Sequence, residues 1–478
     1  MKNREINATA VAIDDNGKGL VRFEDKTIFV DNLLPGEKAE IKLSYAFNTL
    51  KEAKVIKRFN DSKFRVKPKC KYYESCGGCN LMHLCYAQQL IYKQEKVKNL
   101  LHKFAHLDFE VSPTIGMENP YNYRNKIQVP VGKDKKGNII TGFFEENTHK
   151  IVSNDNCLVQ DERASEVIKA FKSLMEKYHI EPYDEDKRTG LIRHLIIKTS
   201  LHYKQVMVVI VTAVDEFKGR KNLALELIKK CPLVTTVVQN YNPRKTNVIL
   251  GEKERILYGT GKIKDSIFDL TFLISSKSFY QTNPYQVEKL YQKAIELANL
   301  TKEDVVLDAY SGTGTIGLCA SKYVKEVTLV ELVKEAYLDG LKNKEFNKIT
   351  NANFINEDCT NYMLKNKEEK HFDVIFLDPP RKGSTVEFLS ALKEIKPSRV
   401  VYVSCNPVTL ARDLTYLLDQ YEVKAVVPVD MFPHTSHVET IVLLQRKVSQ
   451  SLRKSLNSST FISISALKGT KKDTSRRG

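Results

Sequence analysis

The chain lacks the segments that insert a protein into a membrane or export it. Its 478 residues contain no run of eighteen apolar residues, so we expect no transmembrane helix and no membrane partner. The opening residues, Met1 to Ile6, are not followed by an apolar stretch, so we expect no signal peptide and a soluble, cytoplasmic protein. The sequence also has no internal repeat, which argues against solenoid and propeller architectures.

Acidic residues are fewer than basic residues in this chain. Asp and Glu total 58 against 75 Lys and Arg, which gives a net charge of +17 and a pI near 9.2. Such an excess favours a polyanionic partner, because basic side chains neutralise phosphates and release counterions. About half of the excess lies from Arg446 onward, and we expect the serine-rich residues 447–478 to form a disordered basic tail.

Nine cysteines are present, but a cytoplasmic location excludes a disulfide framework for them. They are expected to serve as metal ligands, as a nucleophile or as core residues. Apolar residues make up 42% of the chain, which is enough for two to four domains with cores of their own.

The first sixty residues read as short alternating strands separated by turns, at 8–13, 20–23, 27–30, 38–43 and 52–56. So many short strands in so little chain predict a small closed β-barrel over residues 1–60. A mixed α+β region follows over residues 61–272.

From residue 273 to 446, strands alternate with helices. A helix is expected from Tyr285 to Leu300, with Thr282 or Asn283 before Pro284 at its start. The expected strands lie at 304–309, 327–331, 353–356, 373–378, 399–404, 424–429 and 439–445. This rhythm predicts an α/β fold with a doubly wound, mostly parallel sheet that binds its ligands at the carboxyl ends of the strands.

A glycine-rich turn follows the first of these strands, between Asp308 and Gly317, and it includes Gly312. Glu331 ends the next strand, at a distance that suits binding of a ribose diol. An Asp at the strand end favours a cofactor with an amino-acid moiety over a dinucleotide. The pattern resembles motif I of S-adenosylmethionine-dependent methyltransferases, and by that resemblance Asp358 would meet the adenine.

Asp378-Pro379-Pro380-Arg381 ends the fourth strand. In amine methyltransferases an aromatic residue follows Asp-Pro-Pro and stacks on the target base. Arg381 stands there in this chain, which argues against an amine acceptor and favours a carbon acceptor.

Cys405 and Glu439 stand at the ends of two strands expected to be neighbours. They could be a buried structural cysteine and a surface glutamate. They also form the pair needed to methylate carbon 5 of uracil, a poor nucleophile. A thiolate that adds to carbon 6 activates carbon 5, and a base then removes the carbon-5 proton so that the thiol can leave. A thiol with an ordinary pKa is nucleophilic enough for this step.

Four motifs together resemble the class I RNA (uracil-5-)-methyltransferases: Ser278–Asn283, Asp378–Arg381, Ser404–Pro407 and His437–Glu439. The resemblance covers about residues 1–446. It implies a Rossmann-like methyltransferase domain, with Cys405 as nucleophile, Glu439 as base, and a cofactor site that includes Gln281, Tyr310, Glu331 and Asp378. The turns at Gly17–Gly19 and Leu34–Glu37 are similar to those of the OB-like TRAM module, an RNA-binding barrel.

Cys70, Cys76 and Cys79 form a cluster, with Cys85 close behind. On spacing alone these four thiols suggest zinc. The resemblance instead implies a [4Fe-4S] cluster whose fourth ligand is Cys157, as in the 23S rRNA branch of the family. It therefore implies 23S rRNA as the partner of a monomeric enzyme that does not act on DNA. The alternatives are the tRNA T-loop uridine and an inactive RNA-binding module.

Arg124 is left open by the sequence. It is either an RNA or active-site contact or a salt-bridged strand residue.

Overall fold

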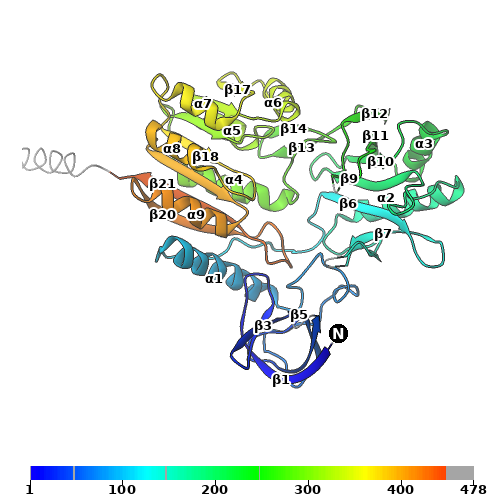
Figure 1. Cartoon of the computed structure of the whole chain (residues 1–478). Helices are drawn as coiled ribbons and strands as arrows, with labels where there is room; N and C mark the ends of the chain where they lie inside the picture. Colours follow the sequence, from blue (N-terminus) through cyan, green and yellow to red (C-terminus); the bar gives the residue numbers. More distant parts are fainter. Residues whose placement is uncertain (1, 47–48, 146–147, 247, 448–478) are drawn as a thin grey trace, which may run out of the picture.

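The computed structural model describes residues 2–46, 49–145, 148–246 and 248–447, and it shows three larger sheets and one hairpin (Figure 1). The predicted basic tail, apart from Lys447, lies outside the described residues. Within these ranges, no helix is long and apolar enough to cross a membrane.

The first sheet has five antiparallel strands in the order β3-β2-β1-β4-β5. The edge strand β3 also contacts β5, so the sheet curls on itself as the predicted barrel requires. Alternate side chains such as Val21, Ile28 and Ile41 fill its interior. The strands are β1 (Lys2–Ile13), β2 (Gly19–Phe23), β3 (Lys26–Val30), β4 (Lys38–Ala46) and β5 (Thr49–Arg58).

The central region is a seven-stranded mixed sheet in the order β12-β11-β10-β9-β6-β7-β8. Helices α2 (Glu162–Lys177) and α3 (Arg220–Lys230) contribute Phe171 and Leu227 to its core. Every residue of β10 is buried, because this central strand is covered on both faces. The strands are β6 (Lys126–Lys133), β7 (Ile139–Phe144), β8 (Ile151–Ser153), β9 (Ile192–Thr199), β10 (Val206–Thr212), β11 (Val234–Tyr241) and β12 (Lys253–Tyr258). The hairpin β13 (Lys262–Ile267) and β14 (Leu270–Ser275) follows.

The C-terminal sheet has the strand order β17-β16-β15-β18-β19-β21-β20. Its first five strands are parallel, and β21 runs antiparallel between β19 and β20. The strand order reverses between β15 and β18, so a crevice for ligands is expected at the carboxyl ends of these two strands. The strands are β15 (Val305–Ala309), β16 (Glu326–Val330), β17 (Ala352–Ile355), β18 (Val374–Leu377), β19 (Arg399–Ser404), β20 (Tyr421–Val429) and β21 (Glu439–Arg446).

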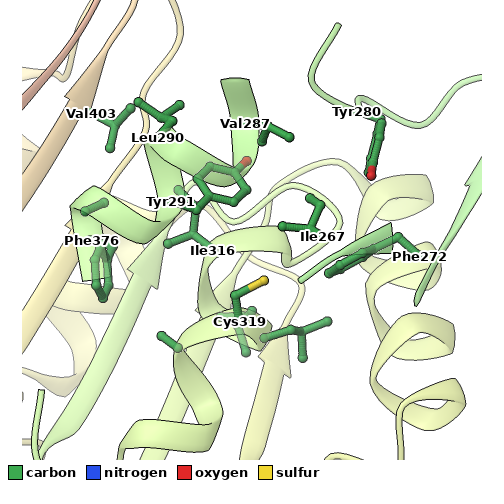
Figure 2. Packing of buried hydrophobic residues seen from close by; sticks show 14 of the residues in the cluster. Ile267, Phe272, Tyr280, Val287, Leu290, Tyr291, Ile316, Cys319, Phe376 and Val403 are labelled. Carbon is green, nitrogen blue, oxygen red and sulfur yellow. The ribbon is translucent and has the colours of Figure 1, made fainter. Parts of the chain in front are cut away.

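Helices cover both faces of this sheet. α4, α5 and α6 pack on one face, where Tyr291 and Ile316 meet Phe376 and Val403 of the strands (Figure 2). α4 begins at Pro284 after an Asn283 cap, as predicted. The other face carries α7, α8 and α9. The helices are α4 (Pro284–Ala298), α5 (Thr315–Ala320), the 3₁₀ turn η1 (Ser321–Tyr323), α6 (Lys334–Phe346), α7 (Cys359–Asn366), α8 (Val386–Ile395) and α9 (Pro407–Leu417).

Helix α1 (Tyr86–Ala105) crosses from the barrel to the C-terminal sheet (Figure 1). It belongs to the segment predicted as the central region, yet its Val97 and Leu101 join the core beside α9. Lys93 of α1 forms a fully buried ion pair with Asp430, which follows β20. Removal of one partner of such a pair costs about 3–5 kcal/mol, because the other charge is left buried and unpaired.

Candidate active site

The Cys405 thiol and the Glu439 carboxyl group lie at one rim of the C-terminal sheet. β19 ends at Ser404 and β21 begins at Glu439, and the two strands pair antiparallel with Ser404 opposite Thr440. Continuing this register by one residue sets Cys405 opposite Glu439, and Cβ atoms of such pairs are about 4.5–5.5 Å apart. The structure therefore brings together the two residues that the sequence analysis paired.

The turn after Cys405 is held by its neighbours. The Asn406 amide donates to the Ser404 hydroxyl at 3.2 Å, and the Asn406 side chain caps α9. The side-chain amide of Asn406 also donates to the carbonyl of Arg381 at 3.1 Å. This bond joins the cysteine turn to the Asp378–Arg381 loop, so two motifs that are separate in sequence meet at one rim.

Burial sets the protonation of both groups. Desolvation, followed by the nearby Glu439 carboxylate, raises the pKa of Cys405 to about 11, while the Arg381 guanidinium opposes the rise. Desolvation also raises the pKa of Glu439 to about 8, and the Asp378 carboxylate adds to this effect. At neutral pH the thiol and the carboxyl group are therefore both largely protonated. The thiol differs from the ordinary one expected from the sequence, because the strand pattern does not reveal this desolvation.

The glycine-rich turn follows β15 as predicted. Asp308 accepts a hydrogen bond from the Gly317 amide at 2.8 Å. A Cβ at position 317 would lie 2.7 Å from Asp308 Oδ2, so only glycine permits α5 to pack this closely on the strand. Gly312 adopts φ of +57°, and its amide donates to Glu331 at 2.8 Å. The turn thus lies between the carboxylates of Asp308 and Glu331.

The other predicted cofactor residues follow strands of the C-terminal sheet or precede α4. Tyr310 follows β15, and its ring packs 5.2 Å from that of Phe388. Asp358 follows β17 and caps α7 by accepting a bond from a backbone amide at 3.1 Å. Gln281 precedes α4, and its carbonyl accepts a hydrogen bond from Asn125 at 3.0 Å. Tyr310 and Asp358 thus stand at the carboxyl ends of two strands of the C-terminal sheet, and Gln281 stands before the first helix that covers it.

Two carboxyl groups near the turn suit a positively charged ligand. Desolvation raises the pKa of Asp308 to about 8 and that of Asp378 to about 7. Asp308 Oδ1 is buried and has no hydrogen-bond partner among the residues that the structure describes. A bound cation would favour the ionised form of both groups. S-adenosylmethionine, with its sulfonium and ammonium groups, has the charge that this donor set can bind.

A second site gathers the predicted cluster ligands. Cys70, Cys76, Cys79 and Cys157 line one pocket, although Cys157 is far from the others in sequence. Cys85, the alternative fourth ligand, lies outside this lining and instead precedes α1 as its N-cap residue. In the described part of the chain, no group of three or more His, Cys, Asp and Glu side chains is arranged to hold a metal ion. Four thiols around one pocket are nevertheless the donor set of an iron–sulfur cluster, which spreads its ligands around several iron atoms.

Arg124 lies in the same pocket. Its amide donates to Val159 at 2.9 Å and its carbonyl accepts from Asp161 at 3.0 Å, which ties it to the segment after Cys157. Its Nε atom is buried without a hydrogen-bond partner within the described ranges. Both roles left open by the sequence stay hypotheses. A guanidinium beside four thiols would neutralise an anionic group held by them.

Two residues that no sequence pattern indicated support the rim where Cys405 and Glu439 lie. Asn80 and Gln89 hydrogen-bond the loop that precedes Glu439, through His434 and Ser436. Their partners lie about 350 residues away along the chain, so no local pattern signals these contacts. The only hint is that Asn80 directly follows Cys79 of the predicted cluster.

Comparisons with known proteins find relatives among RNA methyltransferases. The family model described as tRNA (Uracil-5-)-methyltransferase matches residues 85–447. An uncharacterized RNA methyltransferase of Oceanobacillus iheyensis is 43% identical over 94% of this chain and 98% of its own length. A similar protein of Halalkalibacterium halodurans is 40% identical over 93% of this chain and 98% of its own.

A solved structure matches most of the chain. The crystal structure of the Pyrococcus abyssi tRNA (uracil-54, C5)-methyltransferase in complex with S-adenosyl-L-homocysteine superposes with a TM-score of 0.73 at 28% identity. The match covers 92% of this chain and 100% of that chain. It confirms the predicted fold class, an α/β protein with a Rossmann-like methyltransferase fold preceded by an N-terminal β domain.

Proposed function

The chain belongs to the tRNA (uracil-5-)-methyltransferase family, and from that premise we propose that it methylates carbon 5 of a uridine in 23S rRNA. The observation that carries the proposal is the register of β19 and β21, which, continued by one residue, sets Cys405 opposite Glu439. S-adenosylmethionine supplies the methyl group, and the cytoplasm, where ribosomes assemble, is the expected location.

Cys405 acts as the nucleophile. Its sulfur bonds to carbon 6 of the uracil, which places electron density on carbon 5. Carbon 5 then takes the methyl group as the sulfonium–methyl bond breaks and S-adenosylhomocysteine is released. Because burial holds the pKa of the Cys405 thiol near 11, the thiol must pass its proton to solvent water as the sulfur adds, and the thiolate that leaves at the end of the cycle takes a proton back. The Arg381 guanidinium favours the thiolate at this stage.

Glu439 acts as the base. It takes the proton from carbon 5, the electron pair of that bond re-forms the carbon 5–carbon 6 double bond, and the thiolate leaves. The pKa of Glu439, about 8, makes it a stronger base than an exposed glutamate and keeps it close to the operating pH. Only the ionised fraction can accept the proton, so activity should rise with pH up to about 8.

The cofactor contacts follow from the strand ends. Asp308 and Asp378 would bind the positively charged part of S-adenosylmethionine, and Glu331 would bind its ribose. The Gly312 amide already orients the Glu331 carboxylate. Tyr310, Gln281 and Asp358 complete the set by resemblance to the family.

Cys70, Cys76, Cys79 and Cys157 would hold a [4Fe-4S] cluster, and their common pocket supports this assignment. When bound, the cluster would tie segments that are far apart in sequence. Methyl transfer needs no electron, so we assign the cluster a role in organising the RNA-binding part of the protein.

The tRNA T-loop is the second candidate substrate. The Pyrococcus abyssi enzyme, named for uridine 54 of tRNA, matches a share of this chain larger than residues 85–447 can provide. Its likeness therefore extends into the N-terminal barrel, and domain architecture does not separate the two substrates. The preference for 23S rRNA rests on the cysteine cluster, which resembles that of the rRNA branch.

The test uses full-length protein purified without oxygen. We expect labelled methyl from S-adenosylmethionine to enter transcripts of 23S rRNA, as 5-methyluridine at a defined site, and not to enter tRNA transcripts. The Cys405→Ala variant is the control for contaminating activity. Methylation of the T-loop uridine alone would overturn the rRNA assignment, and label in a base other than uridine would overturn the reaction.

A further inference from the structure

The loop Asp430–Val438 leads directly into Glu439 and is strained. Its two ends meet in the sheet, where Val429 pairs with Glu439. In the middle, His434 is buried and adopts φ of +67°, a left-handed conformation that a residue with a side chain rarely takes. Such a conformation persists only where the surroundings over-determine it, and it is concentrated at functional sites.

Hydrogen bonds from the Asn80–Leu81 backbone and from the side chains of Asn80 and Gln89 hold the loop in this conformation. The backbone amides of Asn80 and Leu81 donate to the His434 carbonyl at 3.1 and 3.0 Å. The Asn80 side chain accepts from the Ser436 amide at 2.8 Å and donates to the Ser436 hydroxyl at 3.0 Å. Gln89 of α1, fully buried, accepts from the His434 amide at 2.9 Å. His434 and Ser436 are therefore both held by residues that lie outside the C-terminal sheet.

The same side chains reach the other two parts of the molecule. Asn80 directly follows Cys79 in the cysteine pocket, and its side-chain amide also donates to the carbonyl of Asn16 in a barrel turn. Lys96 of α1 repeats this arrangement. Its Nζ donates to the Asp15 carbonyl of the barrel at 2.6 Å and to the Ser436 carbonyl at 2.8 Å. The barrel turn, the cysteine segment and the active-site loop thus meet at the hydrogen bonds of Asn80 and Lys96, a set of contacts that we call the joint.

We propose that Asn80 is a positioning residue, which sets the Glu439 carboxylate relative to the bound uracil and links that setting to the barrel and the cysteine segment. The inference rests on the proposed role of Glu439 as base. Loss of the Asn80 side chain would leave the buried Ser436 amide without its partner and let the strained loop relax. Carbon-5 proton removal would slow, whereas addition of the Cys405 thiol, which directly follows β19, would be little affected.

Asn80 is itself exposed at the rim of the joint, so its replacement should leave the protein folded. In Asn80→Ala we expect faster amide hydrogen exchange in residues 434–437, unchanged S-adenosylmethionine binding, and a drop in kcat of about tenfold. The methylated covalent RNA adduct should accumulate during single turnover. The matched control is Asn99→Ala, which removes an exposed asparagine of α1 and should behave like the wild type.

The ratio of adduct to product distinguishes positioning from simple loss of stability. Destabilisation would lower adduct and product together, whereas a misplaced base raises adduct relative to product. Gln89→Leu is the second variant and should shift the ratio in the same direction. An unchanged ratio in Asn80→Ala, or unchanged exchange in the loop, would overturn the inference. Wild-type protein that methylates no uridine would instead overturn the proposed function, and the exchange measurement would still test the joint.

Discussion

Binding of S-adenosylmethionine should tighten as the pH rises from 6 to 8. Burial raises the pKa of Asp308 to about 8 and that of Asp378 to about 7, so both groups are mostly neutral at pH 6. A cation bound beside them favours the ionised carboxylates, so binding lowers both pKa values and releases protons. A reaction that releases protons becomes more favourable at higher pH.

The size of the effect follows from these pKa values. If binding brings each pKa below 5, a group at about 7 changes the affinity roughly tenfold between pH 6 and 8, and a group at about 8 roughly fiftyfold. The two carboxyl groups interact, because the Asp378 charge contributes to the raised pKa of Asp308. Their effects therefore do not simply multiply, and we expect a total between roughly fiftyfold, the larger single effect, and roughly five hundredfold, the product of the two.

Isothermal titration calorimetry at pH 6, 7 and 8 measures this directly. Repeating it in buffers of different ionisation enthalpy counts the protons released. S-adenosylhomocysteine lacks the sulfonium charge and should show a shallower pH dependence. Asp378→Asn should flatten the dependence for S-adenosylmethionine. A dissociation constant that stays the same from pH 6 to 8, with no proton release, would refute the assignment of these carboxylates to the cationic ligand.

Four further outcomes are expected. Cys405→Ala should bind S-adenosylmethionine and RNA without methyl transfer. RNA containing 5-fluorouridine should trap the wild type covalently at Cys405, because fluorine cannot leave as a cation. Mass spectrometry that finds another trapped residue would contradict this. Glu439→Gln should accumulate a methylated covalent adduct on denaturing gels, and turnover at the wild-type rate would assign the base elsewhere. Cys157→Ala should lose iron while Cys85→Ala keeps it, as measured by iron content after anaerobic purification, and stoichiometric zinc in the wild type would reject the cluster. Arg124→Met should lower the reduction potential of the cluster in a potentiometric titration, because it removes a positive charge beside the thiolates; an unchanged potential would place the guanidinium outside the cluster's field.

The alternation of strands and helices was sufficient to predict the C-terminal sheet. Strands such as β18 and β19 are largely apolar runs, as is typical of strands that are covered on both faces of a sheet. β19 was predicted with its bounds, 399–404, and the Asn283 cap of α4 is one of the two starts, Thr282 or Asn283, that the sequence left open. The neighbouring positions of Cys405 and Glu439 followed from the same reasoning, since both stand at strand ends.

The features that could not be predicted from the sequence are those that depend on contacts between distant segments. Nothing near Lys93 indicates that it is buried, because its partner Asp430 lies in another part of the chain. The pKa of Cys405 depends on desolvation and on the charges around it, which a strand pattern does not contain. The position of Arg124 beside the cysteines depends on how its segment pairs with the one after Cys157, and pairing partners are not evident from either segment alone.

The buried ion pair between Lys93 and Asp430 also has a consequence for folding during synthesis, because it joins an early segment to a late one. These residues are 337 positions apart. At the usual pace of translation, roughly 5–20 residues per second, α1 would leave the ribosome roughly 20–70 seconds before its partner strand is complete. During that interval the apolar face of α1, including Val97 and Leu101, has no core to enter. The nascent chain should therefore depend on chaperones until its last strands emerge, and stop codons shortly before residue 430 should yield insoluble protein.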